Sequence, residues 1–344
     1  MSVSTSAARP FFPHQYGVEG KKIRDLRYGE NPHQQASWYQ TAPYGFGDAL
    51  ILQGKEPSYT NLLDADAAAR IVLEFMEPAV AIIKHTNPTG VALGSTAGEA
   101  YFCAREADRL ASFGGIGAFN RPISLGAARH IVETFMEVVI APAVEEEARE
   151  VLATKPNLRV LTANFNPFVS TAKYAEVRSI MGALLTQQRD RVVEADEGWP
   201  TKNTKVMTKR EPTDTEWAAM RFAWRVMAHV KSNAVIFTDE EKTLAIGSGM
   251  GSRVESVKVA LMKATQPSIN GKQMTIPLPV PKLIGSAAAS DAFFPFRDGL
   301  DAVAAAGATC VVQPGGSERD AEVIAAADEH DMAMVFTGRR HFRH

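Results

Sequence analysis

The sequence predicts an α/β protein, on the strength of two observations. Short apolar runs, typical of buried strands, alternate with longer segments whose apolar residues recur at helical spacing. The first series predicts strands at 79–83, 138–141 and 158–163 and helices at 61–75, 99–113, 125–136 and 145–153. Asn61 stands where a helix N-cap is useful. Because strands and helices alternate, we expect the helices to cover a largely buried sheet.

The same pattern restarts after a polar segment, 192–214, that contains two prolines and no periodicity. Beyond it we predict helices at 216–230, 252–264 and 318–330, and strands at 233–238, 243–249, 308–314 and 332–337. The sequence therefore predicts two α/β units of similar plan, without a repeat at the level of residues. The expected division is a loose arm at 1–20, a first unit at 21–200 and a second at 201–344.

Composition excludes several classes of protein. The net charge of −2 gives no overall field that attracts nucleic acid or an anionic membrane. The two cysteines, Cys103 and Cys310, cannot build a disulfide framework or a multi-cysteine zinc site. No signal peptide and no apolar run of about 20 residues is found. We therefore expect a soluble, cytoplasmic protein without nucleic-acid or membrane partners.

Polar or glycine-rich segments break the core pattern at several places. In each case an ordinary loop competes with a functional site. These segments are LRYGENPHQ (26–34), KHTNPTG (84–90), SFGGIGAFN (112–120), GSGMGSR (247–253), SDAFFPFRDG (290–299) and GRRHFRH (338–344).

KHTNPTG places Lys84 and His85 side by side at the end of a predicted strand. Asn87 and Pro88, which favour turns, follow at once, so we expect a rigid turn there. A surface turn that happens to carry a lysine remains the competing interpretation.

The other segments allow two interpretations each. In GSGMGSR, backbone N–H groups and Arg253 could face one anion at a helix start, or the segment is a plain strand-to-helix turn. Pro295 argues against a core strand at 290–299 and favours the wall of a pocket for a flat ligand, with core packing as the alternative. The C-terminal arginines and histidines are either frayed or docked.

Three chemistries find no motif in the chain. Zinc deamination needs a Pro-Cys-x-x-Cys helix, serine hydrolases need G-x-S-x-G, and zinc proteases need H-E-x-x-H.

In this order, these segments, together with IAPAVEEEA, GALLTQQRD and VKSNAVIFT, resemble the transformylase half of the bifunctional purine-biosynthesis protein. That half is 5-aminoimidazole-4-carboxamide ribonucleotide (AICAR) formyltransferase. The resemblance covers residues from about 26 to 344. It implies two cytidine-deaminase-like α/β units in tandem, without the deaminase zinc, and a homodimer with active sites between subunits.

The resemblance also implies the reaction. A formyl group passes from the cosubstrate 10-formyltetrahydrofolate to the 5-amino group of AICAR, on the route to inosine monophosphate (IMP), with no metal needed for the chemistry. Only 25 residues precede LRYGENPHQ, so we expect the cyclohydrolase half to be missing and a separate IMP cyclohydrolase to act next.

The resemblance assigns roles to individual residues. Lys84 and His85 are implied as the catalytic pair, with Asn233 positioning the amine or the carboxamide. The nucleotide contacts are implied at Arg27, Tyr28, Asn61, Arg253 (from the partner subunit), Phe293, Arg340 and His344. The folate contacts are implied at Met250, Pro295 and Asp298.

Two alternatives to this activity remain. One is a catalytically silent protein that binds AICAR or a related purine intermediate. The other keeps the transferase but changes the formyl donor, because Met250 and Gly299 stand where many family members carry Gln or Asn.

Overall fold

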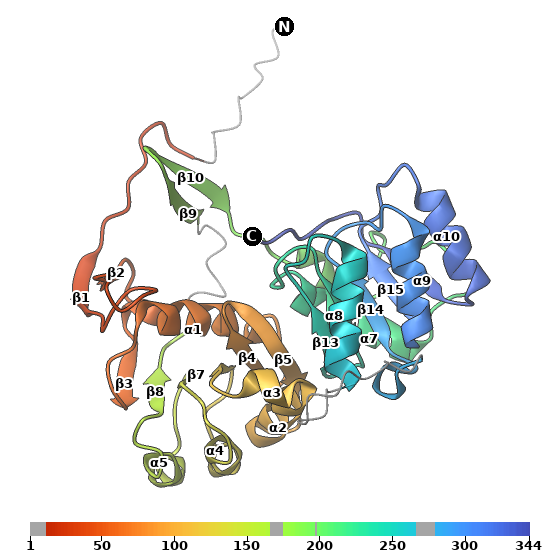
Figure 1. The fold of residues 1–344 in the computed structure, drawn as a ribbon. Coiled ribbons are helices and arrows are strands. Elements are labelled where there is room, and N and C mark those ends of the chain that lie inside the picture. Colours follow the sequence, from red (N-terminus) through yellow and green to blue (C-terminus); the bar gives the residue numbers. More distant parts are fainter. Residues whose placement is uncertain (1–11, 166–174, 197, 266–278) are drawn as a thin grey trace, which may run out of the picture.

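The computed structural model describes residues 12–165, 175–196, 198–265 and 279–344, and it confirms the predicted α/β class. The described residues form two mixed sheets of six strands each, nine α-helices and two small two-stranded ribbons (Figure 1). Residues 12–20 hold no helix or strand, and the rest of the predicted N-terminal arm lies outside the described residues. None of the described helices is long and apolar enough to cross a bilayer.

The first sheet has the strand order β3-β8-β7-β6-β4-β5. Its strands are β3 (Leu50–Gln53), β4 (Ala79–Lys84), β5 (Asn87–Leu93), β6 (Ile116–Phe119), β7 (Val138–Ala141) and β8 (Arg159–Thr162). The helices around it are α1 (Tyr59–Val72), α2 (Ala97–Ala107), α3 (Arg109–Ser112), α4 (Leu125–Val132) and α5 (Glu146–Ala153).

The second sheet has the strand order β11-β16-β15-β14-β12-β13. Its strands are β11 (Lys205–Val206), β12 (Val235–Thr238), β13 (Thr243–Gly247), β14 (Ala287–Ser290), β15 (Cys310–Gln313) and β16 (Ala333–Phe336). Its helices are α7 (Asp214–Met227), α8 (Arg253–Thr265), α9 (Arg297–Ala306) and α10 (Asp320–Glu329).

The two sheets repeat one topology. Each starts with an edge strand and one helix, continues with an antiparallel hairpin (β4–β5 or β12–β13), and ends with three helix–strand steps. The last three strands are parallel to one another in both sheets, and the flanking pairs are antiparallel. The structure thus shows the similar plan that the restart of the sequence pattern predicts.

One apolar core joins the two sheets. Helices α1 and α7 cover the faces of the sheets that belong to this shared core, whereas α2, α4 and α5 cover the outer face of the first sheet and α8, α9 and α10 that of the second (Figure 1). The rings of Phe75 and Phe222 meet within the core at 5.3 Å. The edge strands β5 and β13 also meet, because Val91 N in β5 donates to Thr243 Oγ1 in β13 at 3.0 Å. The two sheets are therefore held in one fixed relation.

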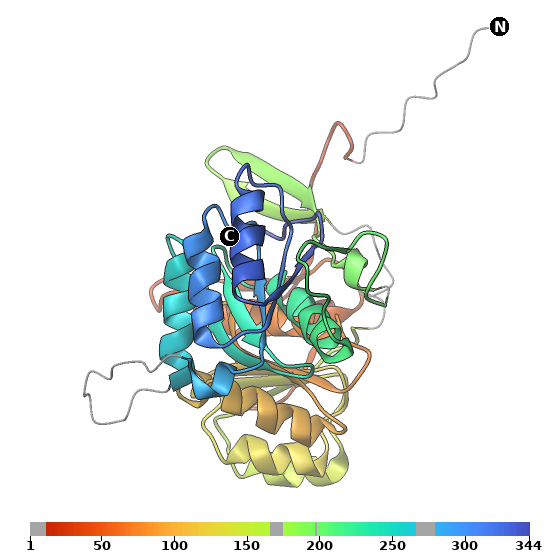
Figure 2. The same cartoon turned by 90° about the vertical axis from the view of Figure 1, so that its right-hand side faces the viewer.

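Two ribbons lie outside the sheets. Strands β1 (Lys21–Asp25) and β2 (Ser37–Gln40) form one, and β9 (Ala175–Ile180) and β10 (Ala183–Gln188) form the other. Both views show the β9–β10 hairpin projecting from the end of the molecule away from α4 and α5 (Figures 1 and 2). The hairpin exposes Val177, Ile180, Leu184 and Leu185.

Several predicted elements need correction. Ser58, and not Asn61, is the N-cap of α1, because its side chain accepts from Asn61 N while the Asn61 side chain accepts from Ser58 N in a capping box. The single helix predicted over 99–113 breaks at Asp108, whose side chain caps α3. The glycine-rich segment 112–120 is not a loop throughout, because it runs into the buried strand β6.

Two glycines allow helices α2 and α8 to pack closely against the edge strands β5 and β13. A β-carbon at Gly90 in β5 would lie 1.9 Å from Ala104 O in α2, and one at Gly247 in β13 would lie 1.8 Å from Ser256 O in α8. Either side chain would force the helix away from its strand. At Gly117, by contrast, the nearest atom would lie 3.6 Å away, which is ordinary contact.

We expect Gly90→Ala and Gly247→Ala each to lower the free energy of unfolding by about 1–3 kcal/mol, because overpacking displaces a helix. Gly117→Ala in β6 serves as the matched control and should cost less. Urea unfolding followed by circular dichroism measures all three. Equal stability of Gly90→Ala and the control would contradict the steric argument.

Candidate functional site

The Lys84–His85 pair lies at a two-residue turn that α1 holds in place. His85 and Thr86 connect β4 to β5 with φ values of 55° and 61°, in the left-handed region that residues other than glycine avoid. Asp64 on α1 compensates, because its carboxylate accepts from His85 N at 3.0 Å and from Thr86 N at 2.7 Å. Burial raises the pKa of Asp64, although these two hydrogen bonds oppose the shift.

The turn predicted at Asn87 and Pro88 is wrong by two residues. Both begin β5, where proline is tolerated because β5 is the last strand in its sheet. The turn falls earlier because Asp64 binds the two amides that precede Asn87.

The two side chains of the pair differ in their surroundings. Lys84 Nζ donates to Phe113 O at 2.9 Å, whereas the His85 side chain is exposed. Beside Lys84 lies an exposed apolar surface that sequence reasoning missed. Phe113 is 57% exposed and packs against Phe135 at 5.4 Å, and Leu110 is 74% exposed.

Arg27, Tyr28 and Asn61 gather at the start of α1. Tyr28 O accepts from the first helical residue, Tyr59 N, at 3.1 Å. The Arg27 guanidinium donates to Tyr28 Oη at 2.5 Å and lies 4.6 Å from the centre of the ring. Asn61 is the third residue of the helix. We call these three, with Lys84 and His85, the first group, because α1 positions all five.

Asp291 positions a second group of predicted residues. Its side chain is fully buried, and Oδ1 accepts from Arg253 Nη2 at 3.0 Å and from Ala234 N at 3.1 Å. Oδ2 accepts from the Ser232 hydroxyl. The backbone oxygen accepts from His341 N at 3.0 Å. Four segments distant in sequence therefore meet at this residue.

Asn233, Met250 and Arg253 lie together beside Asp291. The Asn233 amide donates to Met250 O at 3.0 Å and to Gly251 O at 3.2 Å, which fixes the loop before α8. Arg253 Nε donates to Ser290 Oγ at 3.0 Å, so the guanidinium is bound on two sides within its own chain. Its predicted contact with a phosphate stays a prediction.

The segment after Asp291 divides its side chains between core and surface. Phe294 is fully buried, and its N–H donates to Gln313 Oε1 at 2.9 Å. Phe293 is 37% exposed, and Pro295 is exposed as well. Asp298 is exposed in the first turn of α9 and accepts from Gly299 N at 2.7 Å. Both interpretations of this segment therefore hold in part, because Phe294 packs in the core while Phe293, Pro295 and Asp298 form an exposed surface.

The C-terminal segment is docked. His341 is fully buried, with Nδ1 2.6 Å from Asp190 Oδ2 and Nε2 2.6 Å from Glu194 Oε1. Trp224 Nε1 donates to the same oxygen of Glu194 at 2.8 Å. Burial lowers the pKa of His341, but the two carboxylates outweigh burial and raise it to about 9. A buried imidazolium therefore fixes this segment.

Arg340 and His344 flank this fixed point. The Arg340 guanidinium lies 4.3 Å from the centre of the Phe342 ring. Ser232 N donates to Arg343 O at 2.9 Å, which ties the segment to the one that carries Asn233. We call Asn233, Met250, Arg253, Phe293, Pro295, Asp298, Arg340 and His344 the second group.

A hydrogen bond connects the surroundings of the two groups. Lys231 N donates to Asn87 Oδ1 at 3.1 Å, which joins the strand after the Lys-His turn to the segment before Asn233. The structure thus places a buried carboxylate beside each group, Asp64 in the first and Asp291 in the second, and sequence reasoning missed both. Their signal in the sequence is slight, because each is one of several charged residues in its segment.

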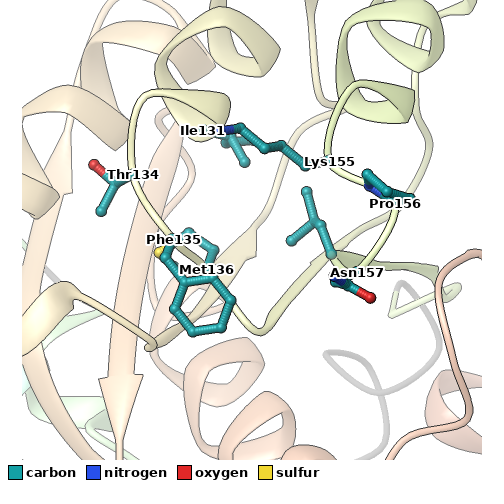
Figure 3. Close-up of a pocket in the computed structure, with 8 residues that line it drawn as sticks. Ile131, Thr134, Phe135, Met136, Lys155, Pro156 and Asn157 are labelled. Atoms are coloured by element: carbon teal, nitrogen blue, oxygen red, sulfur yellow. The ribbon is translucent and has the colours of Figure 1, made fainter.

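A small cavity near the first sheet does not belong to either group. It has a volume of about 140 Å³ and is lined by Ile131, Phe135, Met136 and Lys155, among others (Figure 3). No residue of the first or second group lines it. In the described ranges, no three His, Cys, Asp or Glu side chains are placed to share a metal ion.

Comparison with known proteins relates the chain to one family. The profile of the AICARFT/IMPCHase bienzyme family matches residues 2–263. "Bifunctional purine biosynthesis protein PurH" of Myxococcus xanthus is 49% identical over 350 residues, covering 99% of this chain and 64% of that protein. The proteins of the same name from Magnetococcus marinus and Nostoc punctiforme are 45% and 47% identical, covering 100% and 96% of this chain. The chain thus spans about 64% of the length of the first of these relatives.

We expect stability to fall as the pH rises from about 6.5 to above 9, because His341 loses its proton with a folded-state pKa of about 9 against 6.5 when unfolded. The protonated His341 contributes about 3 kcal/mol to the free energy of unfolding. This contribution is complete below pH 6.5 and is lost as the pH rises through about 9. Urea unfolding across this range measures the loss, and His341→Gln should flatten it. Parallel pH profiles of variant and wild type would contradict the assignment.

Proposed function

Because the chain belongs to the AICARFT/IMPCHase bienzyme family, we propose that it is a folate-dependent formyltransferase. It transfers a formyl group from 10-formyltetrahydrofolate to the 5-amino group of AICAR, in the cytoplasm, during purine biosynthesis. The observation that carries the proposal is the Lys84–His85 pair, which Asp64 holds at an exposed turn next to the start of α1.

The pair suits the chemistry of this transfer. The 5-amino group is a weak nucleophile, because the neighbouring carboxamide withdraws its lone pair. As the nitrogen attacks the formyl carbon, the amine loses a proton and the formyl oxygen becomes an oxyanion. An imidazole such as that of His85 accepts a proton near neutral pH. The ammonium group of Lys84 offsets the oxyanion and assists protonation of the departing folate nitrogen.

The remaining residues of both groups bind and orient the substrates in this proposal. Arg27, Tyr28, Asn61, Arg253, Phe293, Arg340 and His344 hold the nucleotide, and Asn233 orients its amine or carboxamide. Met250, Pro295 and Asp298 contact the folate. The exposed rings of Phe113 and Phe135 beside Lys84 suit a flat aromatic ligand. Fixing both substrates against the catalytic pair lowers the barrier by orientation.

We also propose a tandem of two cytidine-deaminase-like units, at 21–200 and 201–344, in a homodimer. The repeated strand order of the two sheets supports the tandem. The apolar side chains exposed along the β9–β10 hairpin support an association of subunits. In the proposed dimer, Arg253 of one subunit reaches the nucleotide site of its partner, so each site needs both chains.

We expect His85→Ala to lower kcat by roughly 10²–10⁴, with little change in nucleotide affinity, because only the proton acceptor is lost. Lys84→Met should likewise act on kcat. A spectrophotometric assay for tetrahydrofolate formed from AICAR and 10-formyltetrahydrofolate measures both. His130→Ala, which removes a partly exposed histidine on α4, is the control and should keep full turnover. An His85→Ala enzyme that keeps a third of wild-type turnover would refute the role of His85.

The same assay separates this proposal from its rival. AICAR binding by the wild-type chain without any turnover would favour a catalytically silent binding protein. Turnover only with another formyl donor would favour a transferase with changed specificity.

The proposed shared site predicts complementation between subunits. We expect inactive His85→Ala and Arg253→Ala chains to regain activity when they exchange subunits, because the mixed dimer holds one intact site and one doubly defective site. Loss of Arg253 leaves Asp291 buried without its cation, so circular dichroism must show that the Arg253→Ala chain still folds. Exchange demonstrated by mass spectrometry without recovered activity would place each site within one chain.

A further inference from the structure

A large polar cavity opens between α1, the base of the β9–β10 hairpin and the C-terminal segment. Its volume is about 720 Å³. Four arginines line it: Arg70 on α1, Arg178 in β9, Arg189 directly after β10, and Arg343 near the C-terminus. Figure 1 shows the C-terminus ending beside the base of this hairpin. Elements far apart in sequence therefore bring four guanidinium groups to one space.

The carboxylates that line the cavity are already engaged. Asp66 and Glu176 each bind Arg70 at 2.7 Å. Asp190 binds the buried His341 at 2.6 Å. These three carboxylates therefore balance the positive charges of Arg70 and His341.

Two arginines of the cavity form no ion pair with an Asp or Glu side chain among the described residues. Arg178 donates to the main-chain oxygen of His344, the last residue of the sequence, at 3.1 Å. Within the described part of the chain, the partly buried Arg343 side chain makes no hydrogen bond and no ion pair. Burial in the first place, and then the positive charge of Arg70, lower the pKa of both Arg189 and Arg343. A guanidinium that remains charged in such surroundings attracts an anion.

We propose that this cavity binds a small organic anion that carries phosphate or carboxylate groups. Its volume falls in the range of about 300–1,000 Å³ that small-molecule sites occupy. Guanidinium groups match both kinds of oxyanion with paired hydrogen bonds. The cavity adjoins the site of the proposed function, because His344, which that function assigns to the nucleotide, is one of its lining residues. Arg27 and Arg253, which the proposed function also assigns to the nucleotide, do not line it, so the inferred anion occupies a further subsite.

Occupancy also has a structural consequence. An anion between Arg178 and Arg343 would connect the projecting hairpin to the C-terminal segment. That segment carries Arg340 and His344, which the proposed function places at the nucleotide. The anion therefore stabilises the position of these two residues.

The test is calorimetric titration of the full chain with inorganic pyrophosphate and, separately, with citrate, which distinguishes phosphate from carboxylate recognition. We expect one anion per chain, and at least about tenfold weaker binding in Arg343→Gln, because a hydrogen bond to a charged group is lost. Arg178→Gln, on the exposed hairpin, should weaken binding several-fold without endangering the fold. Arg149→Gln on α5 removes the same charge elsewhere and is the control. Arg27→Gln tests whether pyrophosphate binds instead at the proposed nucleotide site.

The Arg149→Gln control should bind pyrophosphate within about twofold of the wild type, since long-range charge effects are screened. Absence of binding in the wild-type chain, or a loss that follows Arg27 and not Arg343, would overturn the proposal. The titration contains no formyl donor, so its outcome does not depend on turnover. Failure of formyl transfer and failure of this site are therefore separate results.

Discussion

The fully buried carboxylate of Asp291 is the constraint on which the second half of the molecule depends. A charge in the interior is tolerated only when it is paired and hydrogen-bonded. Asp291 meets this condition by binding Arg253, Ser232 and the Ala234 amide, and its backbone carbonyl binds His341. Removing one partner of such a buried pair typically costs about 3–5 kcal/mol. The loop before α8, the end of β14 and the C-terminal segment are therefore positioned by one residue.

Asp64 plays the corresponding part in the first half, by a different means. Among the described residues Asp64 forms no ion pair, and its carboxylate instead accepts from the two amides of a turn whose φ values are unfavourable for His85 and Thr86. The strained turn persists because a buried helix supplies the acceptor. In both halves an exposed polar side chain is thus carried by backbone that a buried carboxylate fixes, which is the arrangement expected where reacting groups must hold one orientation.

The sequence predicts those parts of this fold whose signal is local. The apolar run 138–141 coincides with β7, and the predicted helix 252–264 differs from α8 by one residue at each end. Strand β14, of sequence AAAS, was missed because alanine carries no preference for strands, and its burial comes from the strands and helices that pack around it. Likewise, the glycines of 112–120 indicate a loop until the pairing of β6 with β4 and β7 makes them part of a core strand.

The same distinction separates the parts of the candidate site that sequence reveals from those that it conceals. Lys84 and His85 are adjacent in sequence, so their pairing is visible directly. The partners of Asp64 and Asp291 lie 21 to 59 residues away and include backbone amides, which have no sequence signature. The arginine-lined cavity is concealed for the same reason, because its four cations come from α1, both sides of a hairpin and the chain's last residues. Candidate reactive side chains can thus be identified from the order of residues in the sequence. The charged residues that position them or lie around them can be identified only once the chain is folded.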